Sequence, residues 1–198
     1  MSPRVTEAHI EARYNEILGA AFRCFARSGL HGTTMQNIAD EADLSAGALY
    51  RYFESKEALV RTLATRSAER RLETFSRLET GAGVEALANL VFEILGSLEA
   101  EEAEASVRLD VRLWAEMLDE PEGREIILDA FASLREPVAA FVRAEQQAGR
   151  IAKSVEPGAV GWVVLSLMAG VELQRAYEPK LDLAAYRTVV RQLLAGLG

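Results

Sequence analysis

The chain has 198 residues, of which 49% are hydrophobic and 26% are charged, and this composition excludes an intrinsically disordered protein. Ala, Leu, Glu and Arg dominate, so we expect an all-α fold. The single cysteine, Cys24, excludes an intramolecular disulfide, and the isolated His9 and His31 predict no metal site and no cofactor. The N-terminus lacks the pattern of a secretory signal, which predicts a cytoplasmic protein with no membrane partner. The most apolar run of the chain, 159–171, is too short to span a bilayer and is expected to be a helix buried on all sides.

The formal net charge of −8 is unevenly distributed along the chain. Residues 1–80 carry 11 Lys and Arg against 11 Asp and Glu, whereas residues 81–198 carry 11 against 19. The first part is therefore neutral and can meet phosphates, while the second part is acidic and is repelled by them. Any contact with nucleic acid is expected in the first part.

Three helices are predicted at the start of the chain. Apolar residues recur at helical spacing over 7–28, and Gly29 follows where a helix C-cap would stand. A second helix is expected over 33–42, because its first four residues have the spacing of a capping box. Ser45 can then cap a short third helix over 46–53.

Six further helices follow, which makes about nine in all. A long helix is predicted over 55–80, and the two glycines after it mark a boundary between functions. Apolar periodicity predicts the others at residues 84–98, 105–118, 121–148, 157–177 and 183–197. Pro121 and Pro157 stand in first turns, where a missing N–H costs little, and Asp182 is expected to cap the last helix. Pro137 falls inside a periodic segment and is expected to kink or split that helix.

Two short helices joined by a tight turn and braced by longer helices form a helix-turn-helix. Ile38 and Leu49 can supply its small core, and Ala39 is small enough for the two short helices to cross closely. The residues 46–48 are small and allow close approach to base edges in the major groove. We therefore expect a three-helix DNA-binding domain in residues 1–54 and a helical domain in residues 55–198, connected by the helix 55–80.

The segments Thr33-Thr34-Met35-Gln36-Asn37-Ile38-Ala39 and Leu44-Ser45-Ala46-Gly47-Ala48-Leu49-Tyr50-Arg51-Tyr52-Phe53-Glu54-Ser55-Lys56-Glu57-Ala58-Leu59 resemble the DNA-binding signature of the TetR family. The resemblance runs from about Ile17 to Leu63. It implies a transcriptional regulator that is not an enzyme: a homodimeric repressor that a small-molecule effector releases from a near-palindromic operator on double-stranded DNA. Asp43 replaces a frequent glycine of the family, and it tolerates the left-handed backbone of the turn.

The resemblance also assigns DNA contacts residue by residue. Contacts to the phosphate backbone are expected from Thr33 or Thr34, Tyr50, Tyr52 and Lys56. Contacts to bases are expected from Ser45, Ala46, Gly47 and Ala48, and Arg51 is expected to contact either a base or a phosphate. Ala48 stands where the family often has threonine, so the operator sequence does not follow from that of relatives. The acidic second part leaves an alternative open, an interaction protein whose helix-turn-helix no longer reads DNA.

The second domain is expected to hold an effector pocket and a dimer contact, both implied by the resemblance. The pocket is predicted at Phe92, Arg112, Trp114, Met117, Phe131, Trp162 and Met168. The dimer contact of the last two helices is predicted at Gly161, Leu165, Ala169, Gly170, Leu173, Val190 and Leu194. Ordinary core packing within one chain is the alternative for both sets.

Overall fold

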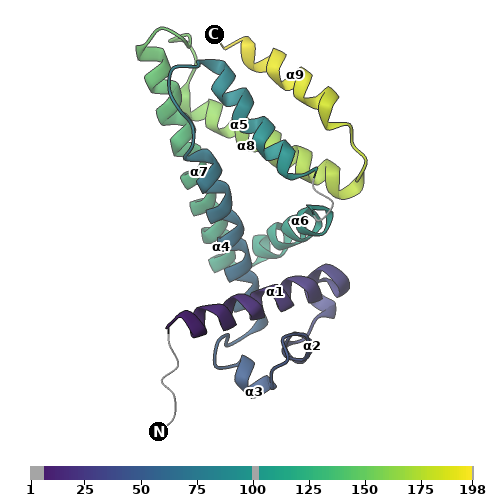
Figure 1. Ribbon diagram of the computed structural model, residues 1–198. Coiled ribbons are helices and arrows are strands. Elements are labelled where there is room, and N and C mark those ends of the chain that lie inside the picture. The colour runs from purple at the N-terminus through teal and green to yellow at the C-terminus, as the bar shows by residue number, and fades with distance from the viewer. Residues whose placement is uncertain (1–6, 100–102, 198) are drawn as a thin grey trace. The chain divides into compact units, whose positions relative to one another are not determined.

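The structure is a computed structural model that describes residues 7–99 and 103–197, and these residues form nine α-helices and no strand. The helices are α1 (Glu7–Gly32), α2 (Met35–Glu41), α3 (Ala46–Leu49), α4 (Lys56–Phe75), α5 (Val84–Ser97), α6 (Ala103–Asp119), α7 (Pro121–Gln147), α8 (Pro157–Tyr177) and α9 (Leu183–Ala195) (Figure 1). The predicted all-α fold is confirmed. The chain divides into two compact units between Thr65 and Arg66, so that α4 has residues in both.

Local signals fix the helix ends of the first unit, with three shifts from the prediction, the first being that α1 runs to Gly32 and does not end at residue 28. Gly29 interrupts α1 with a φ of 73°, a left-handed conformation that favours glycine. The capping box of α2 lies one residue later than predicted, because Thr34 and Asn37 exchange its hydrogen bonds. The helix α3 ends at Leu49 and not near Phe53, since the N–H of Tyr52 bonds to Leu49 and tightens the chain into a turn.

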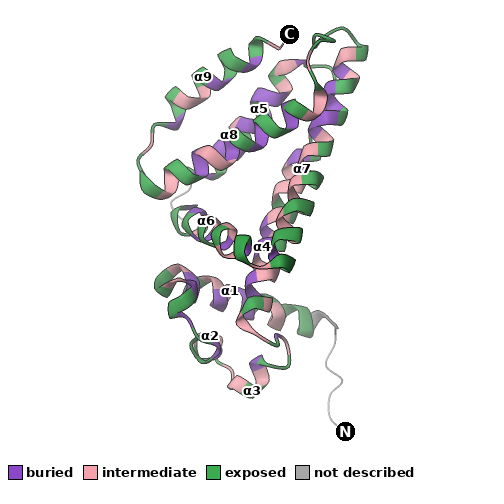
Figure 2. Ribbon diagram, turned by 180° about the vertical axis from the view of Figure 1, so that it is seen from behind, coloured by how far each residue is buried: buried purple, intermediate pink, exposed green. Residues whose placement is uncertain are grey.

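The second unit is a helical bundle with α8 at its centre. Packing contacts join α8 to α5, α6 and α7, and α9 lies along α5 (Figure 1). Figure 2 shows buried residues along α5 and α8 and mostly exposed residues on α9. Asp182 caps α9, and Pro121 and Pro157 occupy the first turns of their helices, as predicted. Pro137 lies inside α7 without splitting it.

The helix α8 was expected to be buried on all sides, and this expectation is wrong. By length and composition α8 could cross a membrane. Val160, Val164 and Val171 are buried against neighbouring helices, which accounts for much of this apolar character. Val163 and Leu173, in contrast, are about half exposed, so α8 also has an uncovered apolar side.

A buried carboxylate anchors the connection between α4 and α5. Glu145 on α7 is inaccessible to solvent and accepts hydrogen bonds from the amides of Gly81 (2.8 Å) and Gly83 (2.9 Å). Arg150 donates to both of its oxygens, at 2.6 and 2.8 Å. These bonds, those of Arg150 foremost, lower the pKa of Glu145 to about 2.

Replacing Glu145 by Gln is expected to lower the free energy of unfolding by about 2–3 kcal/mol. The NH2 group of the glutamine amide would replace one carboxylate oxygen and would face the N–H donors of Gly81, Gly83 or Arg150 without an acceptor. Since folding lowers the pKa of Glu145, its contribution is complete above the ordinary value of 4.5 and is lost as the pH falls towards 2. Urea unfolding at pH 7 and pH 3, at one protein concentration, should show the difference from wild type shrinking in acid. Glu136→Gln, an exposed change on the same helix, is the control; equal effects of the two variants would contradict the anchor.

Candidate DNA interface and effector pocket

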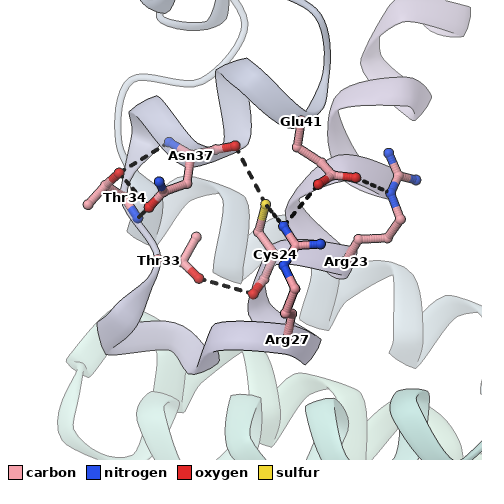
Figure 3. A network of polar contacts seen from close by, with 7 residues as sticks. All are labelled: Arg23, Cys24, Arg27, Thr33, Thr34, Asn37 and Glu41. Carbon is pink, nitrogen blue, oxygen red and sulfur yellow. Dashed lines mark hydrogen bonds and ion pairs between the residues drawn. The ribbon is translucent and has the colours of Figure 1, made fainter.

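Charged residues brace α2 against α1. Glu41 at the end of α2 receives Arg23 Nε at 2.7 Å and Arg27 Nη2 at 2.9 Å from successive turns of α1 (Figure 3). These hydrogen bonds, that of Arg23 foremost, lower the pKa of Glu41. Cys24 lies between them as a buried thiol whose pKa is raised by desolvation, and its Sγ contacts the carbonyl oxygen of Asn37 at 3.6 Å. The first two helices are therefore joined by polar as well as apolar contacts.

The turn between α2 and α3 has the geometry that a helix-turn-helix requires. Ile38, Ala39 and Leu49 are inaccessible to solvent, so the predicted small core is confirmed. Asp43 has a φ of 53°, the left-handed conformation expected of this position. The amide of Leu44 closes the turn on the carbonyl of Ala39 at 2.9 Å. This packing holds α3 at the surface of the first unit.

Most of the residues predicted to contact DNA are accessible on this unit. Ser45, Gly47, Tyr50 and Arg51 are exposed, as is Thr34 at the start of α2, while Ala46, Ala48, Tyr52 and Lys56 are half-buried. The side chain of Ser45 caps α3 by accepting from the amide of Ala48 at 3.2 Å. A Cβ atom added at Gly47 would meet no atom within 4 Å. The tip of α3 is thus small and unobstructed within its own unit.

Two predicted DNA contacts are engaged inside the protein. Thr33 is buried, and its hydroxyl donates to the carbonyls of Gly29 (2.7 Å) and Cys24 (3.2 Å). Of the two threonines, only Thr34 reaches the surface. Lys56 Nζ donates to the carbonyl of Leu30 at 2.9 Å, near the end of α1. The ammonium has further N–H groups, so this bond leaves it able to donate to a second acceptor.

A pocket of about 410 Å³ opens in the second unit between α4, α5, α6 and α8. Apolar residues such as Ile94, Leu98 and Val107 form part of its wall. Its polar residues include Ser67, Arg70, Arg71, Asp110 and Glu172. Arg71 joins the two carboxylates, donating from Nη2 to Asp110 Oδ2 at 2.8 Å and from Nη1 to Glu172 Oε1. The volume and the mixed lining suit a small organic molecule.

None of the seven residues predicted for the effector site lines this pocket. Met117 and Met168 are buried. Phe131 and Trp162 form an edge-to-face pair with ring centroids 6.0 Å apart, and the rings of Phe92 and Trp114 are covered by arginines. Arg112 is exposed.

The sequence analysis did not single out Arg71 or Glu172, which line this pocket. One signal could have found Glu172, since it is a carboxylate at the end of the most apolar run of the chain.

The residues predicted for the dimer contact fall into two groups. Leu165, Val190 and Leu194 are buried in the core of the second unit. Gly161 faces α7, because a Cβ there would lie 2.3 Å from Arg135 Cγ. Ala169, Gly170 and Leu173 are half-buried or exposed. Val163, Gly170 and Leu173 on α8 and Val189 and Leu193 on α9 are the positions left uncovered, and together they are here called the α8/α9 face.

Comparison with known proteins gives one consistent result. Residues 17–63 match the sequence profile of the bacterial regulatory proteins of the tetR family. The HTH-type transcriptional repressor AcnR of Corynebacterium efficiens is 31% identical over 140 residues, 71% of this chain and 69% of AcnR. The transcriptional regulator UidR of Escherichia coli is 28% identical over 186 residues, 91% of this chain and 90% of UidR. The solved structure of Salmonella enterica GusR has a TM-score of 0.79 and 28% identity, covering 98% of both chains.

Proposed function

The chain belongs to the TetR family of DNA-binding transcriptional regulators, and from this premise we propose that it is a cytoplasmic, homodimeric repressor. In this proposal the dimer binds a near-palindromic operator and leaves it when a small-molecule effector enters the pocket lined by Arg71 and Glu172. The accessible tip of α3 is the observation that carries the proposal, because a helix tipped by Ser45 and Gly47 can approach base edges closely.

Dimerisation is proposed through the α8/α9 face. Its apolar side chains are spaced along one side of each helix, with Val189 and Leu193 one turn apart on α9. A two-fold dimer would place two copies of α3 on successive major grooves, at roughly 34–36 Å. Gly170 leaves open space at its Cβ, which permits the backbone of a second copy to come near.

Release by the effector is proposed to act through α4. This helix supplies Ser67, Arg70 and Arg71 to the pocket and runs without interruption from Lys56. A ligand that changes the position of Arg71 therefore acts on the helix that continues into the DNA-binding unit. The effect is reciprocal, so operator DNA should weaken effector binding by the same factor.

Footprinting of the DNA upstream of its own gene tests the proposal. A repressor should protect a site with two related half-sites, one helical turn or a multiple of it apart. Protection of no site by the folded dimer would instead favour the interaction protein that no longer reads DNA.

Two substitutions should separate the phosphate contacts by their dependence on salt. Lys56→Gln removes a charge but keeps a donor for the carbonyl of Leu30, so the slope of log affinity against log salt should fall by about one per subunit. Tyr50→Phe removes a neutral hydroxyl from a side chain that is 52% exposed. It should weaken binding to all DNA severalfold without changing the slope. An unchanged slope in Lys56→Gln would show that Lys56 does not contact a DNA phosphate and only makes its hydrogen bond to Leu30.

A further inference from the structure

The pocket of the second unit contains more buried negative than positive charge. Glu172 has a side chain only 3% exposed, and Asp110 and Arg71 are exposed by 17% and 19%. The single guanidinium of Arg71 is thus paired with two carboxylates, those of Asp110 and Glu172. Arg70 on α4 and Glu93 on α5 also line the pocket, but both are exposed, and Glu93 already pairs with Arg77 at 2.7 Å. The buried cluster of Arg71, Asp110 and Glu172 therefore has a formal charge of −1 when both carboxylates are ionised.

One carboxylate oxygen of this cluster has no partner. Asp110 Oδ1 accepts from Ser67 Oγ at 3.1 Å, and Asp110 Oδ2 and Glu172 Oε1 both accept from Arg71. Glu172 Oε2 is buried and receives no hydrogen bond. An unpaired buried acceptor is costly, and a charged one costs more. A ligand that brings an N–H donor to Glu172 would remove this cost.

The aromatic residues of the second unit do not provide a cation–π contact for a ligand in this pocket. No aromatic side chain is among the described residues that line the pocket. The ring of Trp114 is covered by the guanidinium of Arg71, 5.4 Å from the ring centroid. A quaternary ammonium ion has no N–H to donate to Glu172 Oε2, and the lining lacks the aromatic faces that often bind such ions.

We propose that the effector of this pocket is a small organic cation with N–H donors, a protonated amine or a guanidinium compound, which pairs with Glu172 while its hydrocarbon part packs on Ile94, Leu98 and Val107. The inference rests on the proposed function, because it names the chemical class of the effector. The cation neutralises the excess charge and supplies the missing donor in a single contact.

Protonation of Glu172 should compete with this ligand. Burial raises the pKa of Glu172, although Arg71 opposes the shift, and Asp110 adds to it. The charged groups around it are Arg70 and Arg71 on α4, Glu93 on α5, Asp110 on α6 and Arg175 on α8 itself. A cation requires the ionised carboxylate, so its affinity should fall as the pH is lowered.

Calorimetry on the full chain with three matched probes tests the proposal. The probes are 2-phenylethylamine, 2-phenylethanol and trimethyl(2-phenylethyl)ammonium, which share one hydrocarbon part, and agmatine extends the set to guanidinium compounds. The amine or agmatine should bind, and the alcohol and the quaternary ion should bind about tenfold more weakly or not at all. Glu172→Gln should weaken amine binding about tenfold or more and remove its dependence on pH.

Glu73→Gln, an exposed change on α4 outside the pocket lining, should leave the affinity unchanged and serves as the control. If Glu172→Gln does not fold, as judged by circular dichroism, Asp110→Asn should show the same loss. The proposal is overturned if the alcohol or the quaternary ion binds as tightly as the amine, if the folded variants keep full affinity, or if neither the amine nor agmatine binds at roughly 10 mM.

Footprinting distinguishes a failure of the cationic-effector proposal from a failure of the proposed repressor function. If an operator is protected and only an uncharged or anionic compound releases it, the proposed function stands and the cationic effector is wrong. If no operator is protected, the proposed function fails, and amine binding still decides the chemistry of the pocket.

Discussion

Replacing Gly47 by Leu is expected to lower the affinity for the operator about a hundredfold while leaving the protein as stable as before or more so. Gly47 is exposed on α3, and a Cβ there meets no atom within 4 Å, so the fold accommodates a side chain. Leucine also favours a helix over glycine by roughly 0.8 kcal/mol. In the proposed complex, however, the new side chain separates α3 from the base edges, and base contacts contribute about 1–3 kcal/mol each.

Fluorescence anisotropy with operator and with unrelated DNA, together with thermal unfolding, checks this expectation. Binding to unrelated DNA should change little, since the phosphate contacts assigned to Tyr50 and Lys56 remain. Gly47→Ala, which adds one carbon, should have a smaller effect on the operator. A folded Gly47→Leu protein with wild-type operator affinity would show that the tip of α3 does not enter the groove.

Replacing Leu193 by Glu is expected to weaken the dimer at least about a hundredfold. The side chain is 63% exposed in the single chain, so its replacement costs the monomer little. In a two-fold dimer through the α8/α9 face the substitution occurs twice, once in each copy. Each carboxylate would be buried without a partner, which costs several kcal/mol.

Sedimentation velocity at micromolar concentrations should find dimers of wild type and monomers of Leu193→Glu. Operator affinity should fall with dimer content, because one copy reads only one half-site. Leu128→Glu is a matched control, since Leu128 on α7 is 56% exposed but lies outside the α8/α9 face. If Leu193→Glu stays dimeric, the chains associate through another surface.

The DNA-binding unit followed closely from the sequence, because its signals act over a few residues. Gly29, Asp43 and Ser45 each fix a helix end or a turn through their own backbone or side chain. The early end of α3 was not foreseen, since the apolar spacing continues to Phe53 while the hydrogen bonds tighten after Leu49. The internal bond of Lys56 was also not foreseen, since it joins residues 26 positions apart.

By itself the sequence determined the all-α fold, the order of the helices and the helix-turn-helix, since helical periodicity, caps and turns depend on neighbouring residues. Only the tertiary structure decided which polar groups meet in the second unit and which apolar side of α8 and α9 stays uncovered. Arg71 and Glu172 are 101 residues apart. Their pairing depends on how α4, α6 and α8 cross, and helical spacing gives the apolar side of a helix but not the helix that covers it.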